Sequence, residues 1–409
     1  MTRTILYQIL IVVALVLGIE AALRIAHTIR LDLEKEPSWF RYAADVGWDR
    51  RPGYSGDDDC DANRTFDENG LVASEGERLA VKDGPKRLRV VFLGDSNTYG
   101  ACRETDETYV SVAGRLVPQV DVINLGMNGY TSFQGYKALL KYGPSIRPDL
   151  IFISFNMNDR RFVLGPELAD SDAAFRRIAR GDLFQRLSEA SYFVWAAAEA
   201  STWLSGRSVG IARMMDDTES TGVRLDKVVA RVSLQAYRDN LNNMVRWARQ
   251  NNSAVAFLLL GDNPSQTKSI RDGLKRLAEK DHQGAVTTLE KAKDDEEDFW
   301  FAALARLYLS KIYVETGRSQ QAKDVLSMQD AFFSLVGGYP IALDTDYHAV
   351  MRDVASEHGI PVVDAALELN KHPDVFWDYC HFDEKGHEIV GRMVAEAIKA
   401  HLQKVDPTR

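Results

Sequence analysis

The stretch Leu88 to Gly100, LRVVFLGDSNTYG, constrains the fold of this chain more than any other. Five of its first six residues are apolar, which predicts a fully buried, parallel strand. The strand stops at Gly94-Asp95-Ser96, so a serine hydroxyl lies where a central strand meets its loop. Ligands bind at that end of the strands in open α/β sheets. A simple turn uses the same residue types, so the rest of the chain has to decide between a turn and a site.

From Leu88 onward, apolar runs alternate with amphipathic segments. This pattern predicts a parallel sheet that is covered by helices on both faces, and hence an α/β fold. The predicted strands are 88–93, 120–124, 149–155, 254–260 and 360–364. The predicted helices are 107–117, 132–142, 228–250, 345–358 and 384–402.

Two insertions divide this α/β domain into a first part, 86–264, and a C-terminal part, 336–405. One insertion, about 160–227, lies within the first part, and the other, 265–335, is charged and helical. Leu309 to Gly317, followed by Ala322 and Leu326, resembles one tetratricopeptide repeat, although one and a half repeats cannot form a solenoid alone. The sequence leaves open whether 265–335 binds a protein partner or is a plain helical hairpin.

The N-terminal region has two parts. The apolar run Ile5 to Ala26 is long enough for a transmembrane helix and is followed by no convincing cleavage site, which favours an uncleaved anchor, 1–28. The body would then be extracytoplasmic, either periplasmic or extracellular. Residues 29–85 are polar and rich in turns, and we expect a stalk that packs partly on the body.

Charge and cysteine content exclude some functions. The formal net charge of -9, without a lysine and arginine cluster, argues against nucleic acid as a partner. Cys60, Cys102 and Cys380 lack the paired spacing of a zinc site, and we expect neither a metal nor a cofactor. Outside the cytoplasm Cys60 and Cys102 could form a disulfide, with Cys380 free; three unpaired thiols are the alternative.

Four polar motifs lie at the ends of predicted elements: three follow strands, and the fourth comes just before the last helix. They are Ser96, the turn from Asn124 to Thr131, Asn156-Met157-Asn158-Asp159, and Asp378-Tyr379-Cys380-His381. Acyl transfer at a serine needs a base, an acid that orients this base, and donors for the developing oxyanion.

The motifs contain groups suited to each of these tasks. His381 could accept the proton of Ser96, and Asp378, three residues earlier, could orient the imidazole. The N–H of Gly129, the side-chain amide of Asn158 and the N–H of Ser96 itself would form an oxyanion hole with three donors.

Together the motifs resemble the four sequence blocks of the SGNH (GDSL-type) hydrolase family, in the family's order, over about 86–160 and 340–400. The resemblance implies a flavodoxin-like, three-layer α/β/α fold and ester hydrolysis by a Ser-His-Asp triad. It implies that Ser96 is the nucleophile, that Asp378 and His381 complete the triad, and that Gly129 and Asn158 complete the oxyanion hole. The third block usually begins with glycine, whereas Asn156 stands here, so the position of Asn158 is the least determined.

These observations predict a membrane-anchored serine esterase that acts on acyl esters, including O-acetyl esters, of an envelope glycan or lipid. The same residues would serve an O-acyltransferase that uses a sugar hydroxyl as acceptor. A third hypothesis is a non-catalytic envelope scaffold that binds a protein partner through 265–335.

Overall fold

The computed structural model describes most of the region that carries the predicted sheet and site. The described residues are 7, 14–22, 39–43, 45–58, 60, 62–71, 87–164, 169–175, 228–265, 268–294, 299–326 and 344–405.

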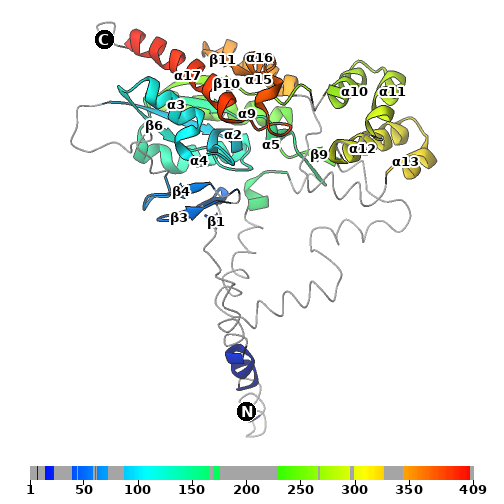
Figure 1. Cartoon of the computed structure of the whole chain (residues 1–409), viewed down its shortest axis with the longest axis horizontal. Helices are drawn as coiled ribbons and strands as arrows, with labels where there is room; N and C mark the ends of the chain where they lie inside the picture. The colour runs from blue at the N-terminus through cyan, green and yellow to red at the C-terminus, as the bar shows by residue number, and fades with distance from the viewer. Residues whose placement is uncertain are drawn as a thin grey trace.

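A five-stranded parallel sheet forms the centre of the fold (Figure 1). The strand order is β11-β10-β7-β5-β6, and every neighbouring pair is parallel. The strands are β5 (Leu88–Gly94), β6 (Val120–Asn124), β7 (Leu150–Ser154), β10 (Ala254–Leu259) and β11 (Val362–Asp364). In chain order this is 2-1-3-4-5, the flavodoxin-like order, whose switch point lies between its first and third strands. The α/β class is confirmed, and β5, which leads to Ser96, is one of the two strands at the switch point.

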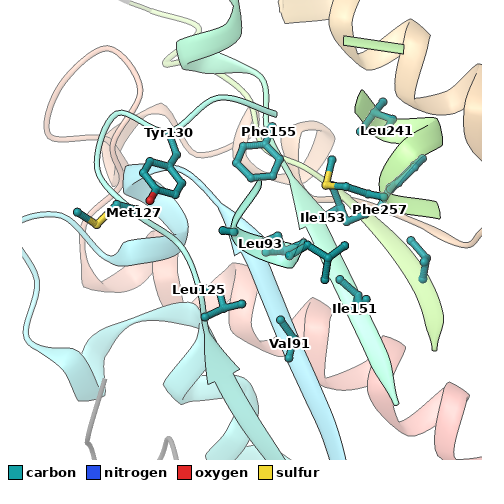
Figure 2. Packing of buried hydrophobic residues seen from close by; sticks show 14 of the residues in the cluster. Val91, Leu93, Leu125, Met127, Tyr130, Ile151, Ile153, Phe155, Leu241 and Phe257 are labelled. Carbon is teal, nitrogen blue, oxygen red and sulfur yellow. The ribbon is translucent and has the colours of Figure 1, made fainter. Parts of the chain in front are cut away.

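Helices cover both faces of the sheet, which gives three layers. One face is covered by α4 (Ser132–Ile146), α9 (Leu234–Gln250) and α15 (Asp344–His358). The other is covered by α3 (Tyr109–Leu116), α16 (Ala365–Leu369) and α17 (Glu384–Val405). Figure 2 shows the first cluster, to which β5 and β7 contribute Val91, Leu93, Ile151 and Ile153. Alternate strand residues such as Val90 and Phe92 belong to the second cluster, because side chains of a strand point to opposite faces.

The predicted helix 228–250 is wrong at its start. Val228–Ala230 form β9, which pairs antiparallel with β8 (Phe162–Leu164). The helix begins only at Leu234, because the hydroxyl of Ser233 accepts a hydrogen bond from the N–H of Ala236 and caps it. Adjacent valines favour a strand, but the sequence analysis assigned them to the helix that follows. Of the insertion predicted at 160–227, residues 165–168 and 176–227 lie outside the described residues.

The described part of the second insertion is helical, as predicted. It contains α10 (Lys268–Ala278), α11 (His282–Ala292), α12 (Phe299–Glu315) and α13 (Ser319–Val325), which lie together at one end of the molecule (Figure 1). The four helices share a hydrophobic cluster of their own, centred on Leu289, Leu304 and Ile312. Arg271 of α10 pairs with Asp344 of α15 at 3.2 Å, so the insertion also contacts the α/β body. Its resemblance to a tetratricopeptide repeat stays a prediction.

The segment expected to be a stalk has folded parts that join the core. It contains two antiparallel pairs, β1 (Phe40–Ala43) with β2 (Gly47–Arg50), and β3 (Ser55–Asp57) with β4 (Asn63–Thr65). Trp39, Val46, Tyr54 and Phe66 belong to the first core cluster. Contact with the body is thus more extensive than the polar sequence indicates. The disulfide left open by the sequence forms between Cys60 and Cys102, and Cys380 is free and buried.

The predicted membrane anchor lies largely outside the described residues, which include only Tyr7 and 14–22 of the run Ile5 to Ala26. Within the described part of the chain, no helix combines the length and the apolar character that a membrane crossing needs.

Candidate active site

The serine turn at the end of β5 is held in place by its neighbours. Ser96 begins the short helix α2 (Ser96–Tyr99), and Asp95 caps it because its carboxylate accepts a hydrogen bond from the N–H of Asn97 at 3.0 Å. Gly94 has no room for a side chain, since a β-carbon would lie 2.8 Å from the carbonyl oxygen of Ser154. The Gly-Asp-Ser sequence therefore fits this turn and fixes the position of the Ser96 hydroxyl.

The structure brings His381 and Asp378 to this hydroxyl. Nε2 of His381 lies 2.8 Å from Oγ of Ser96, and Nδ1 lies 2.6 Å from Oδ2 of Asp378. The other carboxylate oxygen, Oδ1, accepts hydrogen bonds from the N–H groups of Cys380 and His381 at 2.8 and 2.6 Å. Burial raises the pKa of Asp378, but the hydrogen bond and charge of His381 outweigh it, so the pKa stays below its usual value. The carboxylate can thus hold Nδ1–H and leave Nε2 as the acceptor for the serine proton.

Three residues that sequence analysis did not select support this arrangement. Asn97 donates a hydrogen bond from Nδ2 to the carbonyl of Cys380 at 3.0 Å, which ties α2 to the loop that holds the histidine. The N–H of Asn263, after β10, donates to the carbonyl of Tyr379 at 2.8 Å. Trp377 stacks on His381 with ring centroids 5.1 Å apart. The position of Asn263 just beyond a strand was the signal available, because Ser96 and Asn158 share it.

The loop that carries Gly129 packs against the serine turn. The side chain of Asn124 donates to the carbonyl of Thr98 at 2.7 Å, and the N–H of Met127 donates to the carbonyl of Gly94 at 3.2 Å. Gly129 has φ of +76°, and a β-carbon there would lie 3.1 Å from the ring of Trp48. Glycine is therefore the residue that this position tolerates, because of both its backbone conformation and its contact.

Asn158 lies beside the same loop. It belongs to α5 (Met157–Arg160), which follows β7, and its Nδ2 donates to the carbonyl of Tyr130, next to Gly129, at 3.1 Å. Because an amide nitrogen carries two hydrogens, one N–H of Asn158 has no acceptor among the described residues. The structure thus brings the predicted residues Gly129 and Asn158 to one place at the carboxyl edge of the sheet.

Asn156, which replaces the usual glycine of the third block, is accommodated without strain. Its φ of -177° is extended backbone that any residue adopts. The side chain is buried and lies 2.9 Å from Nε2 of His348 on α15. Asn156 therefore makes a structural contact with α15, and the backbone that leads to Asn158 does not need glycine.

One group of side chains has the composition of a metal site. Ligand atoms of Asp378, Cys380 and His381 lie within 4.8 Å of one another, the sole such group among the described residues. Nδ1 of the histidine already contacts Asp378, and burial raises the pKa of the Cys380 thiol. Because metal binding needs a deprotonated thiol, these residues suit serine chemistry better than metal binding.

The comparisons with known proteins identify the family of this chain. The model of the GDSL-like Lipase/Acylhydrolase family matches residues 92–306, which is more than half of the chain. The chain belongs to this family. The predicted family is thus confirmed, and this family member is an SGNH-type ester hydrolase. No curated protein matches the chain.

Solved structures that are similar to this family member share low sequence identity with it. A lipase/acylhydrolase from Enterococcus faecalis is 15% identical, with 77% of this chain and 96% of that chain covered and a TM-score of 0.37. A putative lipolytic G-D-S-L protein from Desulfitobacterium hafniense is 12% identical, with 76% and 99% covered and a TM-score of 0.33. A catalytic mutant of an acetylxylan esterase from Geobacillus stearothermophilus is 14% identical, with 76% and 94% covered and a TM-score of 0.36.

Proposed function

We propose that the protein hydrolyses acyl esters with Ser96 as nucleophile, His381 as general base and acid, and Asp378 as the residue that orients the imidazole. One observation carries this proposal. Two contacts, of 2.8 Å from Ser96 to His381 and of 2.6 Å from His381 to Asp378, form a continuous chain from hydroxyl to carboxylate. Such a chain can activate a serine hydroxyl, which is a weak nucleophile at its ordinary pKa.

The reaction follows from this arrangement. Oγ of Ser96 attacks the ester carbonyl while Nε2 of His381 takes the hydroxyl proton. The negative charge on the carbonyl oxygen is stabilised by the N–H groups of Ser96 and Gly129 and by the side-chain amide of Asn158. The intermediate collapses, and the alcohol leaves with the proton from His381. A water molecule then attacks the acyl-serine, His381 again takes and returns a proton, and the acid is released.

We further propose that the substrate is an acyl ester, such as an O-acetyl ester, of an envelope glycan or lipid. Two features support a location outside the cytoplasm. The apolar run Ile5 to Ala26 is long enough for a membrane anchor, and disulfides such as Cys60–Cys102 persist mainly in oxidising compartments. An enzyme held at a membrane surface would meet acylated polymers and lipids there.

Labelling of the full chain with a fluorophosphonate serine probe tests the proposal. We expect stoichiometric labelling of the wild type, no labelling of Ser96→Ala, and strongly reduced labelling of His381→Ala. Ser145→Ala is the matched control, because Ser145 is an exposed serine on α4 and should label as the wild type does. Labelling that persists in a folded Ser96→Ala variant would show that another residue is the nucleophile.

A further inference from the structure

Arg161 lies directly beside the proposed oxyanion hole. It follows α5, and its Nη1 donates a hydrogen bond to Oδ1 of Asn158 at 3.3 Å. Burial lowers the pKa of Arg161, and nearby Arg231 lowers it further, whereas Tyr379 and Cys380 act in the opposite direction. The guanidinium is therefore close to both the donor amide and the loop that holds Asp378 and His381.

Neighbouring arginines have carboxylate partners, and Arg161 differs from them. Arg160 lies 2.6 Å from Asp262, and Arg231 lies 2.8 Å from Asp170. Among the described residues no carboxylate lies within 4.0 Å of the Arg161 guanidinium, and its one hydrogen bond goes to a neutral amide. A partly buried positive charge without a counter-ion is unfavourable in the free protein. An anion bound at this place would remove that penalty.

We propose that Arg161 binds a carboxylate of the substrate next to the ester bond that is cleaved. This inference rests on the proposed function, and it adds the class of substrate, an ester whose acyl or alcohol part carries a carboxylate. The planar guanidinium suits a carboxylate because it can donate two parallel hydrogen bonds. One unpaired guanidinium balances one negative charge, which favours a carboxylate over a phosphate monoester, whose charge at neutral pH is between about -1.5 and -2.

Pairs of substrates that differ only in charge provide the test. A 3-carboxyphenyl acetate is compared with 3-carbamoylphenyl acetate, and a 4-nitrophenyl hemisuccinate with the corresponding succinamate ester. In the first pair the carboxylate is on the alcohol part of the ester, and in the second pair it is on the acyl part. In the wild type we expect kcat/KM for the carboxylate to exceed that for the amide by about tenfold or more in one pair, the value of one hydrogen bond between charged groups.

The variant Arg161→Gln removes the charge but keeps a side-chain N–H that can reach Asn158. We expect the carboxylate preference to disappear, while hydrolysis of the neutral amide esters changes only a few-fold. The control is Arg246→Gln, which makes the same change in net charge at an exposed position near the carboxyl end of α9. A merely structural role for Arg161 would slow both esters of a pair equally and leave the preference unchanged, which would overturn the proposal.

A binding measurement separates this proposal from the proposed function. Calorimetric titration of Ser96→Ala with benzoate and with benzamide needs no turnover, so it remains informative if the enzyme hydrolyses none of the esters. We expect benzoate to bind at least about tenfold more tightly than benzamide, and this difference to disappear in Ser96→Ala/Arg161→Gln. Equal binding of the two ligands, or tighter binding of inorganic phosphate than of benzoate, would contradict a carboxylate site.

Discussion

Oγ of Ser96 lies 2.8 Å from Nε2 of His381, although 285 residues separate the two along the chain. β5 brings Ser96 to the switch point of the sheet, and the hydrogen bond from Asn97 to the Cys380 carbonyl holds the histidine loop against α2. Groups held in this way before the substrate arrives lose little entropy in the reaction, which makes catalysis efficient.

The two oxygens of Asp378 have separable tasks, and two substitutions should distinguish them. Asp378→Asn keeps an oxygen that can accept the N–H groups of Cys380 and His381, but it places an N–H donor opposite Nδ1 of the histidine. The imidazole would then turn to the wrong tautomer, and we expect kcat to fall by about 10⁴-fold with an unchanged melting temperature.

Asp378→Ala also removes the acceptor for the two backbone N–H groups, so we expect lower thermal stability in addition to lost activity. Steady-state kinetics and thermal unfolding of both variants check this. The matched control is Asp374→Asn, the same change at an exposed position of the preceding 3-10 turn, Pro373–Val375. Full activity in Asp378→Asn would show that the carboxylate does not orient the base.

Buried histidines should make the protein acid-sensitive. Burial lowers the pKa of His387 to about 3, and its Nδ1 accepts a hydrogen bond from the N–H of Tyr109 at 3.1 Å. Its unfolded pKa is about 6.5, so between this value and about 3 the unfolded state binds more protons. The stability that neutral His387 provides is therefore complete above pH 6.5 and is lost as the pH falls through that window.

His387→Asn keeps an acceptor near Nδ1 and removes the titration. Its free energy of unfolding should be lower than that of the wild type at pH 7.5, because packing of the ring with Tyr109 is lost. Below pH 6.5 the wild type loses stability and the variant does not lose this part, so the difference in free energy of unfolding between them should shrink by up to about 1.4 kcal/mol per pH unit. Urea unfolding between pH 4.5 and 7.5 measures both effects, and parallel curves for the two proteins would refute the assignment.

The strand that ends at Ser96 shows how much a sequence of this kind determines. A run of apolar residues that is buried on both faces has few alternative structures, so the predicted strand 88–93 differs by one residue from the observed Leu88–Gly94. The predicted Ser96, Asp378 and His381 come together for a related reason. Ser96 follows a strand, and Asp378 and His381 come just before α17, so each lies within a few residues of an element that the local pattern defines.

Contacts between distant loops could not be predicted in this way. Asn263 donates a hydrogen bond from Nδ2 to the carbonyl of Asp378, 115 residues away, at 3.3 Å. Its partner depends on the strand order, which a single sequence does not specify. The burial of Arg50 could not be predicted either. It lies in a polar segment, which predicts an exposed side chain, but it is only 2% exposed. Its guanidinium donates to the carbonyl of Asn124, so a tertiary contact satisfies a charge that a sequence pattern assigns to the solvent.

The buried ion pair between Arg160 and Asp262 should be important for stability. The two side chains are 1% and 6% exposed, and their charged atoms are 2.6 Å apart. Asp262→Ala would leave the guanidinium without this partner, so we expect the free energy of unfolding to fall by about 3–5 kcal/mol. Glu368→Ala is the control, because its pair with Lys371 is exposed on the surface, so its loss should change the free energy of unfolding far less. Similar losses in the two variants would argue against a specific role for burial.

The Cys60–Cys102 disulfide should stabilise the N-terminal segment against the serine helix. It closes a loop with a sequence separation of 42 residues and joins the β3–β4 region to the residues that follow α2. The chain-entropy relation gives about 4 kcal/mol for a loop of this length, and we expect Cys60→Ser/Cys102→Ser to lose stability of that order. Arg64 donates hydrogen bonds to Asp58 and to the Gly100 carbonyl at 2.9 and 2.6 Å, so the fold should persist in the double variant.

Denaturant unfolding with and without a reductant checks the contribution of the disulfide. The reductant should lower the unfolding midpoint of the wild type to that of the variant. An unchanged wild-type midpoint, with full reduction verified by thiol titration, would contradict the prediction.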